Sequence, residues 1–211
     1  MIRFGKAEYV PAMKKLWQQV FGDSDAYLAA FFQQQYEDRN TLVYVADNKP
    51  VAALYMIPYK MRIASEVVDV VYLYALATAP SFRGQGIMSS LIERSFEIAY
   101  ERGYVLSILI PAEKSLFDYY RRFGYETCFD KSTVTLDTAM LTKIAQTSEP
   151  MPLEKADAEQ VWQIYEKSYL LADKCVLLSQ RQNAFNIHQL EAENGGALVF
   201  DMKDEAKGYA L

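Results

Sequence analysis

The sequence is poor in the residues that build metal centres and disulfide frameworks. Its 211 residues include two cysteines, Cys128 and Cys175, which lack the CxxC spacing of a zinc or redox site. The single histidine, His188, argues against a His-rich metal site, and any Ser-His-Asp apparatus would have to use it. We therefore predict no bound metal and no disulfide framework.

Long apolar runs and an excess of basic charge are also absent. No run approaches the roughly 20 apolar residues that a membrane helix needs, and the N-terminal residues 1–6 lack the apolar core of a secretory signal. The 22 Lys and Arg residues are outnumbered by 27 Asp and Glu residues, so the net charge is −5. This balance disfavours binding to a nucleic-acid backbone. We expect a cytoplasmic protein with neither a membrane nor a nucleic-acid partner.

The first 136 residues carry alternating helix and strand patterns, and half of the whole sequence, 51%, is hydrophobic. Apolar residues recur at helical spacing in some segments and alternate with polar residues in others, which distinguishes the helices from the strands. The run at 104–110 is almost continuously apolar, which is typical of a strand buried on both faces. The spacing predicts helices over 7–20, 27–36, 87–102 and 114–123, strands over 41–46, 51–63, 67–78 and 104–110, and a strand pair or one long strand over 127–136. This order indicates a mixed α/β domain.

A glycine-rich turn joins the strand that ends at Thr78 to the helix that starts at Ile87. Gly84 and Gly86 allow a tight turn and keep side chains away from a ligand. The backbone N–H groups of such a turn converge at the positive end of the helix dipole, which favours a phosphate group. We predict an anion site over Arg83–Met88.

The spacing Arg83-x-x-Gly86-x-Met88 resembles the pyrophosphate-binding motif Gln/Arg-x-x-Gly-x-Gly/Ala of the GNAT N-acetyltransferases. Position 88 departs from it, because the family prefers Gly or Ala there. The resemblance implies an α+β GNAT fold with a mixed, largely antiparallel sheet, and acetyl-CoA as co-substrate. It also implies that the strand before the turn splays from the strand at 105–110 and holds the pantetheine arm. The cofactor-binding residues it implies are Leu76, Ala77, Thr78, Arg83, Gly84, Gln85, Gly86, Ile87 and Met88.

A second motif, Tyr119-Tyr-Arg-Arg-Phe-Gly-Tyr125, resembles the Leu-Tyr-x-Lys/Arg-x-Gly-Phe signature of the same family. By that match Tyr120 is the catalytic general acid, which returns a proton to the departing CoA thiolate. A phenol with a pKa of about 10 can protonate a thiolate whose conjugate acid has a pKa near 8.5 when the two are held in contact. Tyr119 is the alternative.

The base that accepts the proton of the amine is left open by the sequence. The candidates are Glu113, Glu66 and Asp69, a chain of water molecules as in some family members, or a C-terminal carboxylate as in the enhanced-intracellular-survival type. An aromatic pocket for the amine could be lined by Tyr72, Tyr74, Phe31, Phe32 and Tyr36, which would equally suit an ordinary core.

After the first domain the pattern weakens and then starts again. We expect a GNAT domain over 1–137, a linker over 138–152 and a second unit over 153–211. In this unit a helix from 155, a helix over 176–193 and a hairpin over 197–211 repeat the element order of 1–56. It reads as a partial second GNAT-like domain, so we expect a fragment of a longer protein. Its incomplete sheet would leave an edge that could pair with another chain, as in a homo-oligomer.

These features together favour an enzyme that moves the acetyl group of acetyl-CoA to a primary amine of a small molecule or peptide, by direct attack in a ternary complex. Two alternatives remain: a non-catalytic GNAT-like module that senses CoA or acts as a scaffold, and a tandem-GNAT aminoacyl transferase. A dinucleotide-binding fold is disfavoured because Ser89 stands where its last glycine would be.

Overall fold

Two β-sheets organise the chain, whose computed structural model describes residues 1–130, 137–147, 154–169, 174–193, 195–202 and 206–210. The strands are β1 (Ile2–Phe4), β2 (Thr41–Ala46), β3 (Lys49–Ile63), β4 (Glu66–Thr78), β5 (Leu106–Ile108), β6 (Glu154–Ala156), β7 (Lys174–Leu177), β8 (Ala197–Met202) and β9 (Ala206–Ala210). The larger sheet has the order β1-β2-β3-β4-β5, with β7 paired to β3. The smaller sheet has the order β6-β8-β9. All pairings are antiparallel except that of β4 with β5.

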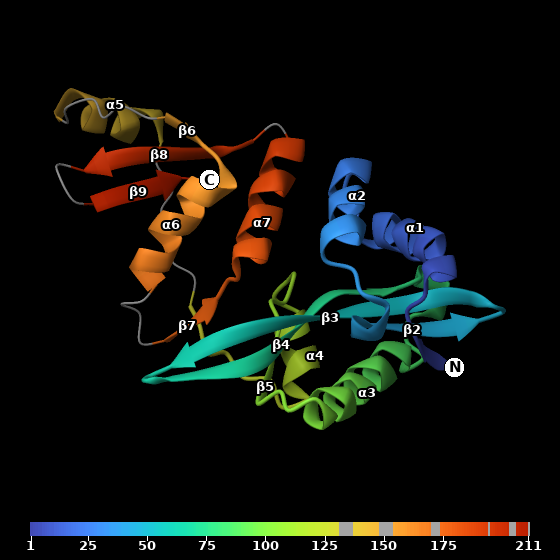
Figure 1. The fold of residues 1–211 in the computed structure, drawn as a ribbon. Helices are drawn as coiled ribbons and strands as arrows, with labels where there is room; N and C mark the ends of the chain where they lie inside the picture. The colour runs from blue at the N-terminus through green and yellow to red at the C-terminus, as the bar shows by residue number, and fades with distance from the viewer. Residues whose placement is uncertain (131–136, 148–153, 170–173, 194, 203–205, 211) are drawn as a thin grey trace.

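Helices cover both faces of the larger sheet (Figure 1). The α-helices of the described residues are α1 (Val10–Phe21), α2 (Asp25–Gln34), α3 (Ile87–Glu101), α4 (Leu116–Arg121), α5 (Thr138–Thr147), α6 (Ala158–Tyr169) and α7 (Gln180–Ala192). Of these, α5 and α6 lie beside the smaller sheet (Figure 1). One buried cluster joins α1 and α2 to the sheet around Trp17 and Phe31, and another joins α3 and α4 around Leu91 and Tyr120. The mixed α/β fold predicted from the sequence is therefore confirmed, with the two core layers set by the two faces of β3 and β4.

The strand at 104–110 differs from the prediction. Only residues 106–108 form β5, which pairs with β4 alone, so it is an edge strand of the described sheet. Val105 is 63% exposed and Ile110 is 78% exposed. The prediction of a strand buried on both faces was wrong, because an apolar run reports low polarity and not the number of neighbouring strands. Residues 127–130 form no strand, and the rest of the predicted strand lies outside the described residues.

The C-terminal unit repeats the opening of the chain in its topology. The path β6, α6, β7, α7, β8, β9 follows the path β1, α1, α2, β2, β3 apart from the additional strand β7, and the sheet order β6-β8-β9 matches β1-β2-β3. The predicted helix over 176–193 was too long, because β7 occupies its first residues and Ser179 begins α7 through a capping box with Gln182. Helix α5 occupies 138–147, which is most of the stretch expected to be a linker.

The second unit packs directly on the first. Strand β7 pairs with residues 60–63 of β3, beyond the point where β2 ends. Helix α7 lies beside α2 (Figure 1), and Phe185 joins the core cluster of the first unit, with its ring centroid 6.3 Å from that of Phe31. The side-chain amide of Gln182 donates a 2.8 Å hydrogen bond to the Pro58 carbonyl. None of the described helices is long and apolar enough to cross a membrane.

Candidate active site

Strands β4 and β5 diverge after three paired residues. Residues 70–72 of β4 pair in parallel with 106–108 of β5. Beyond this point β4 continues to Thr78 with only β3 as its partner among the described strands. The chain after β5 turns away, which opens a cavity of about 190 Å³. The edge of β4 that faces the cavity therefore has backbone groups without a strand partner, as the splayed-strand expectation requires.

A β-bulge reorients β4 beside this cavity. Ala53 pairs with Ala77, and Tyr55 pairs with Tyr74, so Leu54 alone lies opposite the two residues Ala75 and Leu76. The backbone of Ala75 has a φ of 46°, which an L-residue rarely adopts. Such bulges bend a strand and interrupt its ladder. The bulge therefore turns the free edge of β4 toward the cavity at Leu76, one of the residues expected to contact acetyl-CoA.

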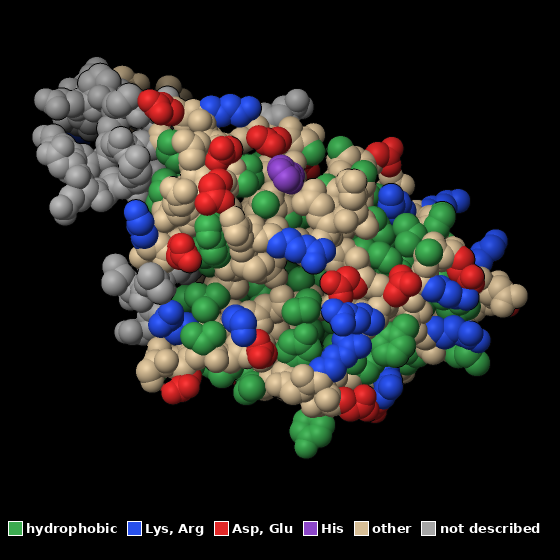
Figure 2. Space-filling view, in the orientation of Figure 1, with side chains coloured by type: hydrophobic (Ala, Val, Ile, Leu, Met, Phe, Trp, Pro, Cys, Tyr) green, Lys and Arg blue, Asp and Glu red, His purple; other side chains and the backbone are tan. Residues whose placement is uncertain are grey.

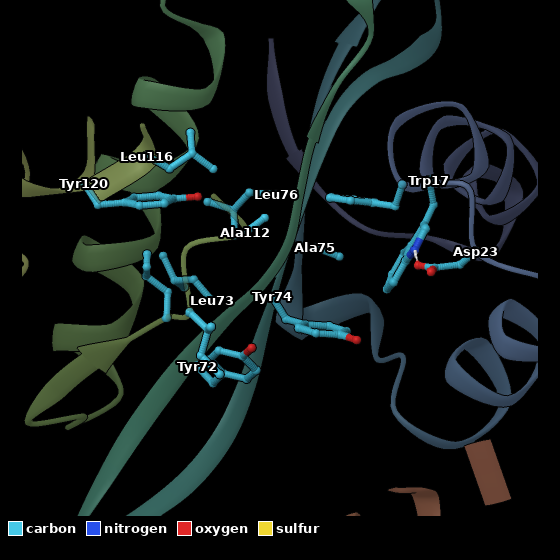
Figure 3. Close-up of a pocket in the computed structure, with 13 residues that line it drawn as sticks. Trp17, Asp23, Tyr72, Leu73, Tyr74, Ala75, Leu76, Ala112, Leu116 and Tyr120 are labelled. Carbon is cyan, nitrogen blue, oxygen red and sulfur yellow. Dashed lines mark hydrogen bonds between the residues drawn. The ribbon is translucent and has the colours of Figure 1, made fainter. Parts of the chain in front are cut away.

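The cavity takes its walls from both faces of the sheet. Tyr120 and Leu116 approach from α4 on one side of β4, whereas Trp17 and Asp23 approach from the other side (Figure 3). It therefore lies along the strand edge, where the two layers meet. The lining residues are Trp17, Phe21, Asp23, Tyr72, Leu73, Tyr74, Ala75, Leu76, Leu109, Ile110, Ala112, Leu116 and Tyr120. Leu109 and Ile110, the end of the apolar run at 104–110, thus line the cavity.

Tyr120 is placed in this cavity and Tyr119 is not. Tyr120 is 8% exposed, and its hydroxyl points from α4 toward Leu76 (Figure 3). Burial, followed by the neighbouring Tyr119 and Tyr72, raises the pKa of Tyr120 to about 12, so its hydroxyl is protonated at neutral pH. Tyr119 instead shares a 3.3 Å hydrogen bond with the Ser89 hydroxyl of α3. Of the two tyrosines in the motif, Tyr120 has the geometry of a proton donor to a group in the cavity.

The glycine-rich turn leads from β4 into α3 as predicted. Gly84 and Gly86 have φ values of 75° and 74°, and Gly86 is the N-cap of α3 without a side-chain cap. The first amides of a helix have no acceptor within the helix. A Cβ placed on either glycine would meet no atom within 4 Å, so the space beside the turn is open. The open turn and its uncapped amides fit a pyrophosphate group.

Two side chains of the turn donate hydrogen bonds to the backbone just before it and so stabilise its conformation. Arg83 donates from Nε to the Thr78 carbonyl at 3.1 Å, and Gln85 donates from Nε2 to the Ser81 carbonyl at 3.3 Å. The side chain of Met88 packs against the core cluster beneath α3. The departure from the family motif at Met88 therefore adds bulk toward the core, and Arg83 and Gln85 shape the turn whose backbone amides are the candidate ligands.

The carboxylates proposed as bases do not line the cavity. Glu66 and Glu113 are exposed, and Asp69 forms a 2.8 Å ion pair with Lys60. Among the described residues that line the cavity, the only carboxylate is Asp23, whose Oδ2 accepts a 2.7 Å hydrogen bond from Nε1 of Trp17. Asp23 directly precedes Ser24, the N-cap of α2, so in the sequence it resembles an ordinary residue at a helix start. No signal in the neighbouring sequence distinguishes a residue at a helix start from one that lines a cavity.

The aromatic residues expected around the amine are only partly brought together. Tyr72 and Tyr74 line the cavity and also a second cavity of about 190 Å³, which lies between α2 and α7 and which we term the α2–α7 pocket. Phe31 lines the α2–α7 pocket, whereas Phe32 and Tyr36 line neither cavity. His188 is exposed on α7 and also lies outside both.

Comparison with known proteins places this site in a family. The family model of the acetyltransferase (GNAT) domain matches residues 1–128, which is more than half of the chain and includes both motifs. No curated protein sequence matches the chain.

Solved structures share the fold at low sequence identity. Eis1 from Mycobacterium abscessus has a TM-score of 0.70 and 18% identity, over 99% of this chain and 52% of that chain. A GCN5-related N-acetyltransferase from Anabaena variabilis has a TM-score of 0.68 and 19% identity, over 99% of this chain and 53% of that chain. An acetyltransferase from Trypanosoma brucei has a TM-score of 0.51 and 18% identity, over 64% of this chain and 99% of that chain. The present chain thus spans about half the length of the first two structures. With its domain match, its splayed strands and its glycine-rich turn, the chain belongs to the GNAT acetyltransferase family.

Proposed function

We propose that this protein is an N-acetyltransferase that moves the acetyl group of acetyl-CoA to a primary amine of a small molecule or peptide. We base this on one observation: Tyr120 and the free edge of β4 face the same cavity, and β4 leads directly into an uncapped glycine-rich turn. The three features lie in the order in which the thioester, the pantetheine and the pyrophosphate of acetyl-CoA follow one another.

The chain's own groups suit this co-substrate. The backbone amides of 84–88 would hold the pyrophosphate, since they lie at the positive end of the α3 dipole. Backbone groups of Leu76, Ala77 and Thr78 would bind the pantetheine and polarise the thioester carbonyl, because β4 has no strand partner on that edge among the described residues. Acetyl-CoA supplies the acetyl group as a thioester, which leaves a CoA thiolate.

Two side chains handle the protons that move in this reaction. The amine nitrogen attacks the carbonyl carbon, the carbon–sulfur bond breaks, the nitrogen loses a proton and the sulfur gains one. Tyr120 donates its hydroxyl proton toward the leaving sulfur. With a pKa of about 12, Tyr120 is a weaker acid than a free phenol. Its hydrogen bond to the developing thiolate therefore contributes as much to catalysis as complete transfer of the proton. The protonated amine must lose one proton before it can attack, and Asp23 attracts it and passes this proton to solvent, directly or through water. The second proton, which nitrogen loses after the attack, restores the Tyr120 hydroxyl through solvent.

We place the GNAT domain over 1–137 and the second unit over 153–211, with α5 in the connection at 138–152. We infer a cytoplasmic enzyme, and interspersed Lys, Arg, Asp and Glu side chains on the face in Figure 2 give no basic patch there for nucleic acid. The edge of the small sheet would be the surface for a homo-oligomer. A CoA-sensing or scaffold module and a tandem-GNAT aminoacyl transferase are the alternatives.

Titration calorimetry of the whole chain with acetyl-CoA tests the proposal. We expect saturable binding that is lost in Gly86→Glu, because the new carboxylate adds negative charge where the pyrophosphate binds and a side chain at a positive φ. Gly103→Glu is the matched control, since Gly103 has a φ of 79° and lies beyond the opposite end of α3. If the unaltered chain does not bind acetyl-CoA, the proposal fails. Binding without turnover of any amine would favour the sensing module.

A further inference from the structure

The α2–α7 pocket adjoins the candidate active site through two shared walls. The half-buried rings of Tyr72 and Tyr74 line both cavities, and their centroids are 5.4 Å apart. Its remaining walls come from α2, β3 and α7, so it exists only because the second unit packs on the first. Its volume of about 190 Å³ corresponds to about six water molecules at their liquid volume, which is enough for a ring-sized group.

The side-chain amide nitrogens of two glutamines in this pocket lack hydrogen-bond partners within the described part of the chain. Nε2 of Gln35 and Nε2 of Gln189 are buried, and neither has a partner among the residues that the structure describes. A buried donor without an acceptor is destabilising, so such groups are normally paired. The two glutamines are 154 positions apart in the sequence and come from different units. An oxygen-bearing ligand would supply the missing acceptors.

The pocket carries no charge. Its described lining residues are aromatic, aliphatic or carboxamide side chains, with no Asp, Glu, Lys or Arg among them. If the acceptor carried a second ammonium group besides the amine that reacts, this pocket would remove its water without supplying a counter-ion, which is costly. The rings of Phe31, Tyr59 and Phe185 instead offer apolar surface to the flat or CH-bearing faces of a ligand.

We propose that the α2–α7 pocket binds the distal part of the acceptor, and that this part is an uncharged, ring-sized group with a hydroxyl, ether or carbonyl oxygen. The oxygen accepts hydrogen bonds from Gln35 and Gln189. The inference rests on the proposed function, because it places the reactive amine in the neighbouring cavity beside Tyr120 and Asp23. It selects a monoamine with a neutral polar tail over a polyamine.

A matched set of amines tests the selection. The whole chain, saturated with CoA, is titrated by calorimetry with cyclohexylmethylamines that carry hydrogen, a hydroxyl or an ammonium group at the 4-position. We expect the hydroxyl compound to bind about tenfold more tightly than the unsubstituted one, the gain of about one net hydrogen bond. The diammonium compound should bind most weakly.

Variants then assign the preference to the two glutamines. In Gln35→Leu and Gln189→Leu the hydroxyl compound should lose its advantage, while the unsubstituted amine binds as before. Gln33→Leu is the control, because Gln33 is exposed in the last turn of α2, two residues before the C-cap Gln35, and lies outside the pocket. Thermal unfolding checks that each variant folds, and the ligand order on the unaltered chain tests the pocket if one does not.

The outcomes are distinct. The proposal is overturned if the diammonium compound binds as tightly as the hydroxyl compound, if none of the amines binds, or if the hydroxyl preference persists in both leucine variants. Failure of CoA to bind would refute the proposed function instead. In that case the same titrations on the free chain still decide whether the pocket selects a neutral oxygen.

Discussion

Tyr120 is the residue in which burial and position have the clearest chemical consequence. The side chain packs in the cluster beneath α3 and presents its hydroxyl to the cavity. Because burial raises its pKa to about 12, the hydroxyl holds its proton throughout the neutral range. In the mechanism proposed above, this keeps the group that would donate to the departing thiolate in its donating form.

Replacement of this hydroxyl should reduce turnover and leave co-substrate binding intact. For Tyr120→Phe we expect kcat to fall about 100-fold, the lower range for loss of a general acid, with little change in the Kd for acetyl-CoA. Tyr119→Phe is the control, since it removes only the 3.3 Å contact with Ser89. Steady-state kinetics and calorimetry measure the two quantities. Equal losses in both variants would contradict the assignment of Tyr120.

Strand β4 is the element on which the site depends. One edge pairs with β3 along its length, while the other edge loses its partner after Tyr72, and the bulge at Ala75 marks the change. The left-handed backbone at Ala75 costs roughly 1–2 kcal/mol for an L-residue. A strained residue at this point indicates that the strand is bent to serve the site and not only the core.

Glycine substitutions in β4 should reveal this strain. Ala75→Gly removes the steric cost but adds about 0.5–1 kcal/mol of chain entropy, so we expect the free energy of unfolding to stay the same or to rise by about 1 kcal/mol. Ala77→Gly, two residues further along the same strand, lacks that compensation and should lower the free energy of unfolding by about 1 kcal/mol or more. Urea denaturation of both variants measures the difference. Equal destabilisation would mean that Ala75 is not strained.

At the scale of the whole molecule, the two units are parts of one packed body. Phe185 of α7 belongs to the core cluster of α1 and α2, and β7 lengthens the larger sheet at the end of β3. The α2–α7 pocket is a product of this contact. The second unit therefore supplies one wall of the α2–α7 pocket, which shares Tyr72 and Tyr74 with the candidate active site.

The many buried tyrosines should make the free energy of unfolding depend on pH in the alkaline range. Burial is the main cause that raises the pKa values of Tyr59, Tyr72 and Tyr120 to about 12, against about 10 in the unfolded chain. Between these values the folded chain holds protons that the unfolded chain has lost, so the free energy of unfolding falls as pH rises. We expect it to be unaffected by these groups below about pH 10 and to decline from there toward pH 12.

Urea denaturation across this pH range measures the decline, and phenolate absorbance supplies an independent control. The folded chain should show fewer ionised tyrosines than the urea-unfolded chain at the same alkaline pH. If the tyrosines titrate alike in both states, or if stability rises over this range, the buried environment of these rings is not as described.

Short-range features were determined by the sequence itself. The glycine-rich turn from Arg83 to Met88, the helix after it and the motif around Tyr120 depend on neighbours within a few positions, and the structure has them where they were predicted. The element order of the second unit was readable for the same reason, because hydrophobic periodicity is a local property.

Tertiary structure alone decided which distant residues meet. Asp23 reaches the cavity only because α1 and the loop after it pack on β4, and Gln35 and Gln189 line one pocket only because α7 packs on α2. The edge position of β5 and the pairing of β7 with β3 likewise depend on long-range strand choice. Periodicity states that a face is apolar, but the partner of that face is set by the packing of the whole chain.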